Sequence, residues 1–343
     1  MRSEHTSFLT LHIQGTGANM ENKILGIHHV TAIASDPQRN VDFYAGTLGL
    51  RMVKVTVNFD DPETYHFYYG DETGRPGTIL TFFPWPGSLR GRRGTGQTTA
   101  VAFSVPQGSL DFWADRLTKA GVKVDQPQER LGETVLTAYD PDGLLIELIA
   151  HEGAEVRPGW PGGPVPMQYA VRGFYGVTLS EGDPMPTALL MENVLGFEAV
   201  AEEDNRVRFQ IGEGGAGTYV DILHLPGTAP GLVSAGTIHH VAYRTPNGDE
   251  QESWRELLYR VGAHPTNIRD RQYFQSIYFR EPGGVLFEIA TDTPGMTYDE
   301  TLENLGFDLQ IPPQYEGLRS GLERSLPPIT IPGVGTIPKV RVA

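Results

Sequence analysis

Four short segments of the chain alternate apolar and polar residues, and this alternation predicts four β-strands. A stretch of helical character follows each strand, opens on residues that favour helix starts and closes at a glycine. The distance from strand to glycine is nearly constant, so the pattern predicts one structural module used four times. The segments run from strands at His29, Ala100, Gly176 and His240 to Gly49, Gly121, Gly196 and Gly262.

Each of the four modules continues into β-rich residues, a turn and a strong final strand. The fourth residue after the turn glycine is Thr81, Glu147, Asp221 or Glu288 in successive modules. The order within a module is therefore β-α-β-β-β. Used four times with curved antiparallel sheets, it predicts an α+β fold built from four βαβββ modules.

The composition fits a globular protein rich in turns and narrows the classes of partner. Glycine and proline contribute 41 and 26 of the 343 residues, which is typical of short strands joined by tight turns. The formal net charge of −15 argues against nucleic acid and against an anionic membrane surface as partners. The chain has no cysteine, which excludes disulfides, thiolate metal sites and cysteine nucleophiles.

The modules also divide the chain into regions. Residues 1–19 lack the apolar core and cleavage site of a signal peptide, so we interpret them as a disordered extension or an upstream mis-start, and we expect a cytoplasmic protein. Residues 20–155 and 156–292 would each hold two modules, and residues 293–343 would end in a proline-rich, extended tail. No apolar run approaches the ~20 residues of a membrane span. We also expect a homo-oligomer.

Two of the predicted strands carry adjacent histidines at repeat-equivalent positions. These pairs are His28-His29 and His239-His240. Neighbouring side chains of a strand face opposite ways, so one histidine of each pair can point into a shared cavity. Glu288, in the last strand of the fourth module, would add a carboxylate. Two histidines and one carboxylate form a set that holds non-haem Fe(II) and leaves coordination positions open.

Three motifs together carry a family resemblance. They are the histidine pairs, the strand Pro-Gly-Gly-Val-Leu-Phe-Glu at 282–288 and the stretch Arg-Gln-Tyr-Phe-Gln-Ser-Ile-Tyr at 271–278. Over about residues 24–315 the chain resembles the vicinal oxygen chelate superfamily (glyoxalase, bleomycin resistance protein and extradiol dioxygenase), and within it the hydroquinone-type ring-cleaving dioxygenases. The resemblance implies that the modules pair into two curved-sheet, barrel-like cups. It also implies that the segment around residues 301–306 covers the barrel.

The repeat positions decide which two modules can share a metal. Pairing the first module with the second, or the third with the fourth, gives a single histidine, and pairing the second with the third gives none. Only the first and fourth modules together supply His29, His240 and Glu288. We therefore predict that these two modules form the active cup. The middle two would form a filled cup without metal.

Other polar strand residues have plainer explanations. Glu147 has Ala100 where a histidine would be needed, so we interpret it as a salt-bridged or hydrogen-bonded remnant. We expect Asp221, near a strand end, to be a surface residue. The sequence leaves open whether His66 and His239 line the cup, because a strand histidine is as often packed or exposed.

The resemblance also assigns roles to three further residues. It implies that His28 supports the metal site from behind, that Arg271 holds a phenolate oxygen and that Tyr278 exchanges protons near the metal. From the residues alone, Arg271 could instead form a surface ion pair with Asp270 or Glu250, and Tyr278 could be a packed core residue. A hairpin between Tyr278 and Glu288 would place these two on adjacent strands.

These observations lead to one functional hypothesis and two alternatives. The first is a non-haem Fe(II) ring-cleaving (extradiol-type) dioxygenase that uses O2 on a hydroquinone or catechol, with Mn(II) as an alternative ion. The second is a glyoxalase-like isomerase or lyase, which would want a fourth protein ligand where Thr81 stands. The third is a non-catalytic drug-binding resistance protein, against which the intact triad argues.

Overall fold

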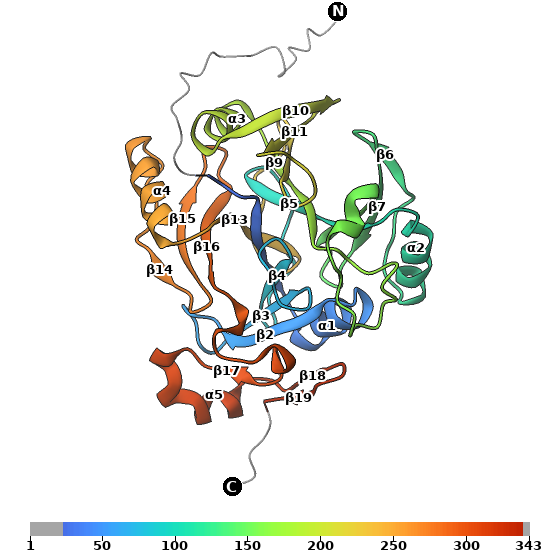
Figure 1. Ribbon diagram of the computed structural model, residues 1–343, viewed down its shortest axis with the longest axis vertical. Coiled ribbons are helices and arrows are strands. Elements are labelled where there is room, and N and C mark those ends of the chain that lie inside the picture. The colour runs from blue at the N-terminus through green and yellow to red at the C-terminus, as the bar shows by residue number, and fades with distance from the viewer. Residues whose placement is uncertain (1–22, 339–343) are drawn as a thin grey trace, which may run out of the picture.

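Two curved β-sheets, each assembled from two βαβββ modules, form the protein in the computed structural model (Figure 1). The structure describes residues 23–338, so the predicted extension at residues 1–19 lies outside the described residues. The α+β class and the repeated module are both confirmed. None of the helices in residues 23–338 is long and apolar enough to cross a membrane.

The first and fourth modules supply most of the first sheet. The first contains β1 (Ile27–Ala34), α1 (Pro37–Val41) with a π-helical continuation (Asp42–Thr47), β2 (Arg51–Val57), β3 (Tyr65–Gly70) and β4 (Ile79–Pro84). The fourth contains β13 (Thr237–Thr245), α4 (Gly248–Arg260), β14 (Arg269–Asp270), β15 (Phe274–Arg280) and β16 (Leu286–Pro294). The sheet order is β14-β15-β16-β13-β1-β4-β3-β2-β17, and β1 meets β13 antiparallel at the seam.

The second and third modules build the second sheet. The second module contains β5 (Gln97–Pro106), α2 (Leu110–Lys119), β6 (Gln128–Arg130), β7 (Glu133–Tyr139) and β8 (Leu145–His151), followed by a 3-10 turn (Glu152–Val156). The third contains β9 (Phe174–Glu181), α3 (Met185–Leu190) with a π-helical continuation (Met191–Leu195), β10 (Phe197–Glu203), β11 (Arg206–Ile211) and β12 (Tyr219–His224). The order β10-β11-β12-β9-β5-β8-β7-β6 confirms the pairing of the first module with the fourth, and of the second with the third. A cut at residue 155 therefore runs through the second sheet.

The helices begin and end where the sequence predicts. The Asp36 carboxylate caps α1 by accepting the N–H of Arg39 at 2.8 Å, and the Asn247 side chain caps α4 in the same way. Each helical segment ends at a glycine with φ between 72° and 80°, a conformation that side chains with a Cβ rarely adopt. The apolar faces of α2 and α4 bury Trp113 and Trp254 against the sheets.

The C-terminal segment packs on the edge of the first sheet, beside β2 and β3 (Figure 1). Its short strand β17 (Leu309–Gln310) pairs in parallel with β2, and the fully buried Lys54 of β2 binds the carboxylates of Asp299 and Glu300. The remaining elements are 3-10 turns (Met296–Tyr298, Leu302–Asn304, Pro313–Leu318), α5 (Arg319–Ser325), β18 (Ile329–Ile331) and β19 (Gly335–Ile337). The described part of the proline-rich tail is thus not simply extended, because β18 and β19 form a hairpin.

Candidate metal centre

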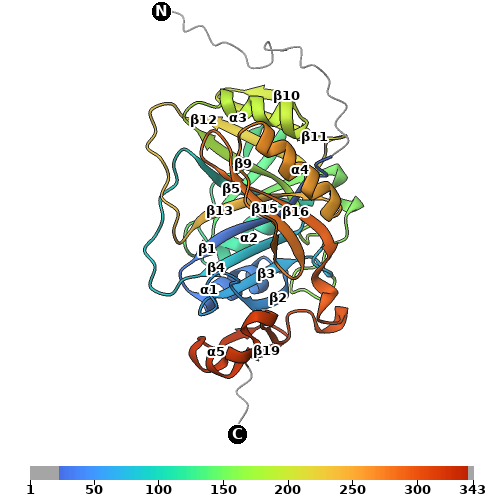
Figure 2. The ribbon, with the colours of Figure 1, turned by 90° about the vertical axis from the view of Figure 1, so that its left-hand side faces the viewer.

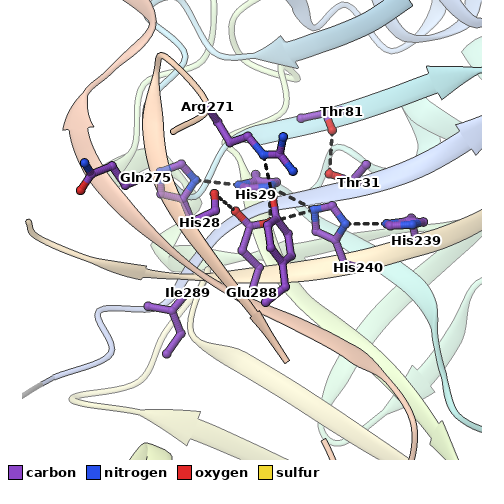
Figure 3. Close-up of polar contacts among 12 residues, drawn as sticks. His28, His29, Thr31, Thr81, His239, His240, Arg271, Gln275, Glu288 and Ile289 are labelled. Atoms are coloured by element: carbon purple, nitrogen blue, oxygen red, sulfur yellow. Dashed lines mark hydrogen bonds and ion pairs between the residues drawn. The ribbon is translucent and has the colours of Figure 1, made fainter. Parts of the chain in front are cut away.

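Three side chains from three strands converge at the seam of the first sheet: His29 of β1, His240 of β13 and Glu288 of β16 (Figure 3). The Nε2 atoms of the two histidines lie 3.3 Å apart. The Oε2 atom of Glu288 lies 3.3 Å from Nε2 of His29 and 2.9 Å from Nε2 of His240. Three donor atoms are therefore aimed at one point from one side, which is the arrangement of a facial triad.

The register of the strands explains this convergence. In the seam between β1 and β13, Thr31 stands opposite His240, so His29 and His240 are offset by two residues and face the same side of the sheet. The parallel neighbour β16 places Glu288 beside Ala242, two residues beyond His240. On the other side of β16, Tyr278 of β15 stands directly opposite Glu288, as the predicted hairpin requires.

The donor set suits a divalent metal. All three side chains are buried, and Glu288 has no exposed surface. Its Oε1 accepts the hydroxyl of Ser276 at 2.5 Å, whereas Oε2, the atom that faces the two histidines, has no hydrogen-bond partner. A buried carboxylate oxygen without a donor is costly unless a cation meets it.

The charge states also favour metal binding. Burial would raise the pKa of Glu288, but the neighbouring His29 and His240 outweigh this effect and hold that pKa well below its usual range. Burial lowers the pKa of His240, so its imidazole is neutral near pH 7. A carboxylate with neutral imidazole is the protonation state that binds a metal.

Each histidine of the candidate metal centre is contacted from behind by its neighbour in sequence. Nδ1 of His28 lies 2.9 Å from Nδ1 of His29, and Nδ1 of His239 lies 2.7 Å from Nδ1 of His240 (Figure 3). His28 is only 1% exposed, and its Nε2 lies 3.1 Å from the carbonyl oxygen of Thr291. The predicted site residue His28 therefore contacts His29 and the backbone, and other residues line the cavity.

A cavity of about 210 Å³ opens beside the two imidazoles, and His29 and His240 belong to its lining. Its walls are largely aromatic, with Phe59, Phe83, Trp85, Phe274 and Tyr278 among them. His66 and His239 also line it, which answers the question that the sequence left open. Planar apolar walls of this kind would hold an aromatic ring and exclude water around it.

Arg271 and Tyr278 enter this cavity together. Nε of Arg271 donates to the Tyr278 hydroxyl at 3.3 Å, and Nη2 of Arg271 donates to Oδ2 of Asp60 at 2.8 Å. The ion-pair partner is thus Asp60, and neither Asp270 nor Glu250. Burial raises the pKa of Tyr278, the charge of Glu288 raises it further, and Arg271 lowers it only in part. Burial therefore outweighs the charge of Arg271, and the Tyr278 phenol is neutral.

Thr81 occupies the place in the first module that Glu288 occupies in the fourth. Its hydroxyl lies 2.8 Å from that of Thr31 and 3.0 Å from Nε2 of His66, and Nδ1 of His66 lies 2.8 Å from the Tyr68 hydroxyl. Burial lowers the pKa of His66 well below its usual value, so this chain of hydrogen bonds is neutral. The position of a fourth, anionic ligand is therefore taken by an uncharged network.

The second cup holds ion pairs at the two positions equivalent to Glu288 and Thr81. Glu147 accepts two hydrogen bonds of 2.7 Å from Arg130, so its interpretation as a salt-bridged remnant is confirmed. Asp221 accepts from Arg206 and Arg208 at 2.7 to 3.1 Å and is only 4% exposed, so the expected surface location is wrong. Within residues 23–338, the triad of the first cup is the only group of this kind with the spacing of metal ligands.

The comparison with known proteins agrees with this architecture. The family model described as the Glyoxalase/Bleomycin resistance protein/Dioxygenase superfamily matches residues 26–148 and 177–289. The chain is 46% identical over 312 residues to MhqO of Bacillus subtilis (strain 168), provisionally named a ring-cleaving dioxygenase, covering 91% of this chain and 99% of that protein. It is 35% identical over 317 residues to the chlorohydroquinone/hydroquinone 1,2-dioxygenase of Sphingobium indicum. This match covers 90% of this chain and 97% of that protein.

Solved structures give the same result for the fold. A crystal structure from Bacillus subtilis subsp. subtilis strain 168, provisionally titled a dioxygenase, superposes with a TM-score of 0.85 at 45% identity and covers 90% of this chain and 98% of that chain. Glyoxalase I from Zea mays superposes with a TM-score of 0.58 at 16% identity and covers 78% of this chain and 92% of that chain. This likeness shows a shared fold alone.

Proposed function

The chain belongs to the glyoxalase/bleomycin resistance protein/dioxygenase superfamily, and we propose that it is a metal-dependent dioxygenase that cleaves the ring of hydroquinone-type or catechol-type aromatics. His29, His240 and Glu288 would hold Fe(II), with Mn(II) as an alternative. The names of the relatives support the reaction class. The observation that carries the proposal is the unpartnered Oε2 of Glu288 facing two imidazole nitrogens beside an aromatic-lined cavity.

The metal, held by His29, His240 and Glu288, would supply the redox chemistry with dioxygen. The chain's own residues bind and orient the substrate. Arg271 would hold an ionised oxygen of the ring by a charge-assisted hydrogen bond. Tyr278, neutral because it is buried, would donate a proton to the reacting ring and recover it afterwards. Phe59, Phe83 and Trp85 would exclude water from the ring.

His28 would act through His29 in this proposal, as a positioning residue. A histidine whose Nδ1 is hydrogen-bonded from behind keeps its ring orientation and tautomer, and such partners strengthen the binding of a metal. His239, which also lines the cavity, would do the same for His240.

The two alternatives have less support. Glyoxalase-like enzymes usually use a fourth protein ligand, and Thr81 is instead tied into an uncharged network with Thr31 and His66. A non-catalytic drug-binding protein would have no need of a buried, unpartnered carboxylate next to two histidines. Neither alternative accounts for both observations.

The proposal is tested by metal analysis together with oxygen uptake. The protein would be reconstituted with Fe(II) or Mn(II), its metal content measured, and oxygen uptake followed with hydroquinone, chlorohydroquinone and catechol. We expect one ion per chain, uptake stoichiometric with ring opening, and loss of both in His29→Ala with an unchanged circular dichroism spectrum. Full metal occupancy in His29→Ala would refute the ligand assignment. Turnover of a hemithioacetal without oxygen uptake would instead support the isomerase.

A further inference from the structure

A second hollow, of about 910 Å³, lies on the outside of the first and second modules and shares no lining residue with the metal cavity. Five basic side chains surround it: Arg39, Arg90, Arg92, Arg93 and Lys123. We call it the basic groove. A concentration of positive charge in one hollow is unexpected for a chain whose formal net charge is −15.

Neutral groups hold these side chains in place, so their charges are positioned without being neutralised. Nε of Arg90 donates to the carbonyl oxygen of Asp142 at 2.7 Å, Nη2 of Arg39 to that of Pro141 at 3.0 Å, and Nη2 of Arg92 to that of Pro230 at 3.1 Å. Arg93 and Lys123 both lie over the ring of Tyr139, with Nζ of Lys123 4.1 Å from the ring centre. Such contacts order the basic groups and leave their charge free to act on a ligand.

Two carboxylates, those of Asp42 and Asp140, also line the groove, where they hydrogen-bond to neutral groups. Asp140 accepts the hydroxyl of Tyr44 and two backbone N–H groups, and Asp142 accepts the N–H and the hydroxyl of Ser35. Asp42 accepts the side-chain amide of Gln38 at 2.8 Å. In residues 23–338, no carboxylate lies within ion-pair distance of the four guanidinium groups, and Lys123 has only Asp125 at 3.8 Å. Five basic side chains against two lining carboxylates leave the groove with an excess of positive charge.

The backbone that carries Arg90, Arg92 and Arg93 is braced. This linker between β4 and β5 runs beside the linker between β12 and β13, and the two are visible as adjacent loops in Figure 2. The N–H of Gly91 donates to the carbonyl oxygen of Ala235 at 2.8 Å. Arg92 and Leu232 exchange two backbone hydrogen bonds of 2.8 and 3.0 Å. Basic side chains on a fixed frame lose less conformational freedom on binding than side chains on a mobile loop.

We propose that the basic groove binds a small polyanion that carries a diphosphate group. Five positive charges around one hollow call for a ligand with several negative charges, and guanidinium groups match phosphate oxygens in pairs. The volume admits a ligand of roughly nucleotide size, within the ~300–1,000 Å³ of small-molecule sites. The Tyr139 ring is already covered by Arg93 and Lys123, so recognition rests on the phosphates and not on stacking.

The test is calorimetric titration of the full-length, metal-loaded protein with inorganic pyrophosphate at low ionic strength. We expect a Kd below ~1 mM that weakens steeply with added salt, because exposed charges are screened beyond ~10 Å at 0.1 M. Arg92→Gln with Arg93→Gln should weaken binding by about tenfold or more, since charge-assisted hydrogen bonds are lost. The control is Arg260→Gln with Arg324→Gln, which changes the net charge equally at two exposed arginines outside the groove.

The outcomes separate the proposal from its competitors. No heat and no thermal stabilisation with 5 mM pyrophosphate, or equal weakening in both double variants, would overturn it. Should the first double variant fold poorly, Arg39→Gln with Arg90→Gln tests two other basic side chains of the groove. Titration with ADP distinguishes a nucleotide from a free phosphate chain as the source of the diphosphate. A change of oligomeric state in the groove variants, without pyrophosphate binding, would mean that the groove contacts an acidic surface of a second copy, against the proposal.

Discussion

Nδ1 of His28 lies 2.9 Å from Nδ1 of His29, and the opposite nitrogen of His28 lies 3.1 Å from the carbonyl oxygen of Thr291. A carbonyl oxygen only accepts, so Nε2 of His28 must carry the proton and its Nδ1 must accept. Nδ1 of His29 is then the donor, which leaves Nε2 of His29 bare. That bare nitrogen is the one that faces His240 and Glu288, so a backbone carbonyl on β16 sets the tautomer that a metal requires.

The first prediction follows from this relationship. Replacement of His28 by phenylalanine keeps the ring volume and removes the acceptor that fixes His29. We expect the affinity for Fe(II) to fall by ~10–100-fold, the usual effect of losing such a partner, with little change in fold. Competition with a chelator measures it, and His224→Phe in the second sheet is the control. Parent-like affinity in His28→Phe would mean that His29 holds its tautomer without help.

The second prediction separates stability from metal binding. Glu147 in the second cup forms a buried, bidentate ion pair with Arg130. Glu147→Gln removes the charge and leaves the Arg130 guanidinium under-compensated, so we expect a loss of about 1–3 kcal/mol in the free energy of unfolding. Metal content and turnover should stay at parent values. Denaturant unfolding and metal analysis check both, and loss of metal would show that the wrong cup was chosen.

The arrangement of repeats was predictable from the sequence because each module repeats the same local pattern. Alternation of apolar and polar residues predicted the strands. Glycines predicted the helix ends, because a positive φ favours glycine whatever the distant contacts are; these are Gly49, Gly121, Gly196 and Gly262. Pairing of the first module with the fourth followed by elimination, because only His29 and His240 stand at equivalent places. These inferences needed no knowledge of distant contacts.

Other features depend on contacts that no local pattern encodes. Asp60 lies on the loop between β2 and β3, about two hundred residues before Arg271, and nothing near either residue signals their ion pair. Asp221 seemed exposed because it nears a strand end, but Arg206 and Arg208 on β11 cover it. The pKa of Tyr278 depended on its degree of burial, which outweighs the charge of Arg271.

The third prediction concerns pH and two buried carboxyl groups at the junction of the two sheets. Glu181 is the last residue of β9, and its Oε1 has no hydrogen-bond partner. Glu281 lies nearby and accepts hydrogen bonds from the Thr187 hydroxyl and from backbone N–H groups. Burial raises the pKa of Glu181 from 4.5 to about 8, with the charge of Glu281 adding to the effect. The folded state therefore holds a proton that the unfolded state releases between these two pH values.

Since the folded state binds the extra proton, the free energy of unfolding falls as pH rises from 4.5 to 8. Glu181→Gln removes this titration. At pH 8.5 we expect the variant to melt at a higher temperature than the parent, by on the order of 2 °C for each kcal/mol gained in the free energy of unfolding. At pH 5 the two melting temperatures should be nearly equal. Thermal scans at both pH values measure it, with the exposed Glu198→Gln as control. An equal shift at both pH values would attribute the gain to packing instead of protonation.

The fourth prediction concerns Tyr278, which stands opposite Glu288 on the neighbouring strand. Tyr278→Phe removes the hydroxyl that receives the hydrogen bond of Arg271 and keeps the ring that packs 5.6 Å from His240. We expect unchanged metal content and a kcat lower by ~10²–10⁴-fold, the usual effect of a positioned proton donor. Steady-state kinetics on metal-loaded protein measures it, with the exposed Tyr298→Phe as control. Parent-like turnover would make Tyr278 a packing residue and leave the proton to water.

The last prediction uses two arginines that share one partner. Arg271 and Arg269 both contact Asp60, at 2.8 and 3.4 Å, but only Arg271 lines the cavity, and the Arg269 side chain is 48% exposed. If Arg271 holds a ring oxygen by a charge-assisted hydrogen bond, Arg271→Ala should raise KM by roughly 10–100-fold and lower kcat less.

Arg269→Ala changes the net charge equally and should leave KM near the parent value, because screened surface pairs contribute little. Asp60→Asn should fall between the two, since it loosens Arg271 without removing it. These three variants distinguish a directed contact from a general effect of charge. A rise in KM shared equally by Arg269→Ala and Arg271→Ala would mean that the loop's overall charge attracts the substrate, and Arg271 would then have no direct role in binding it.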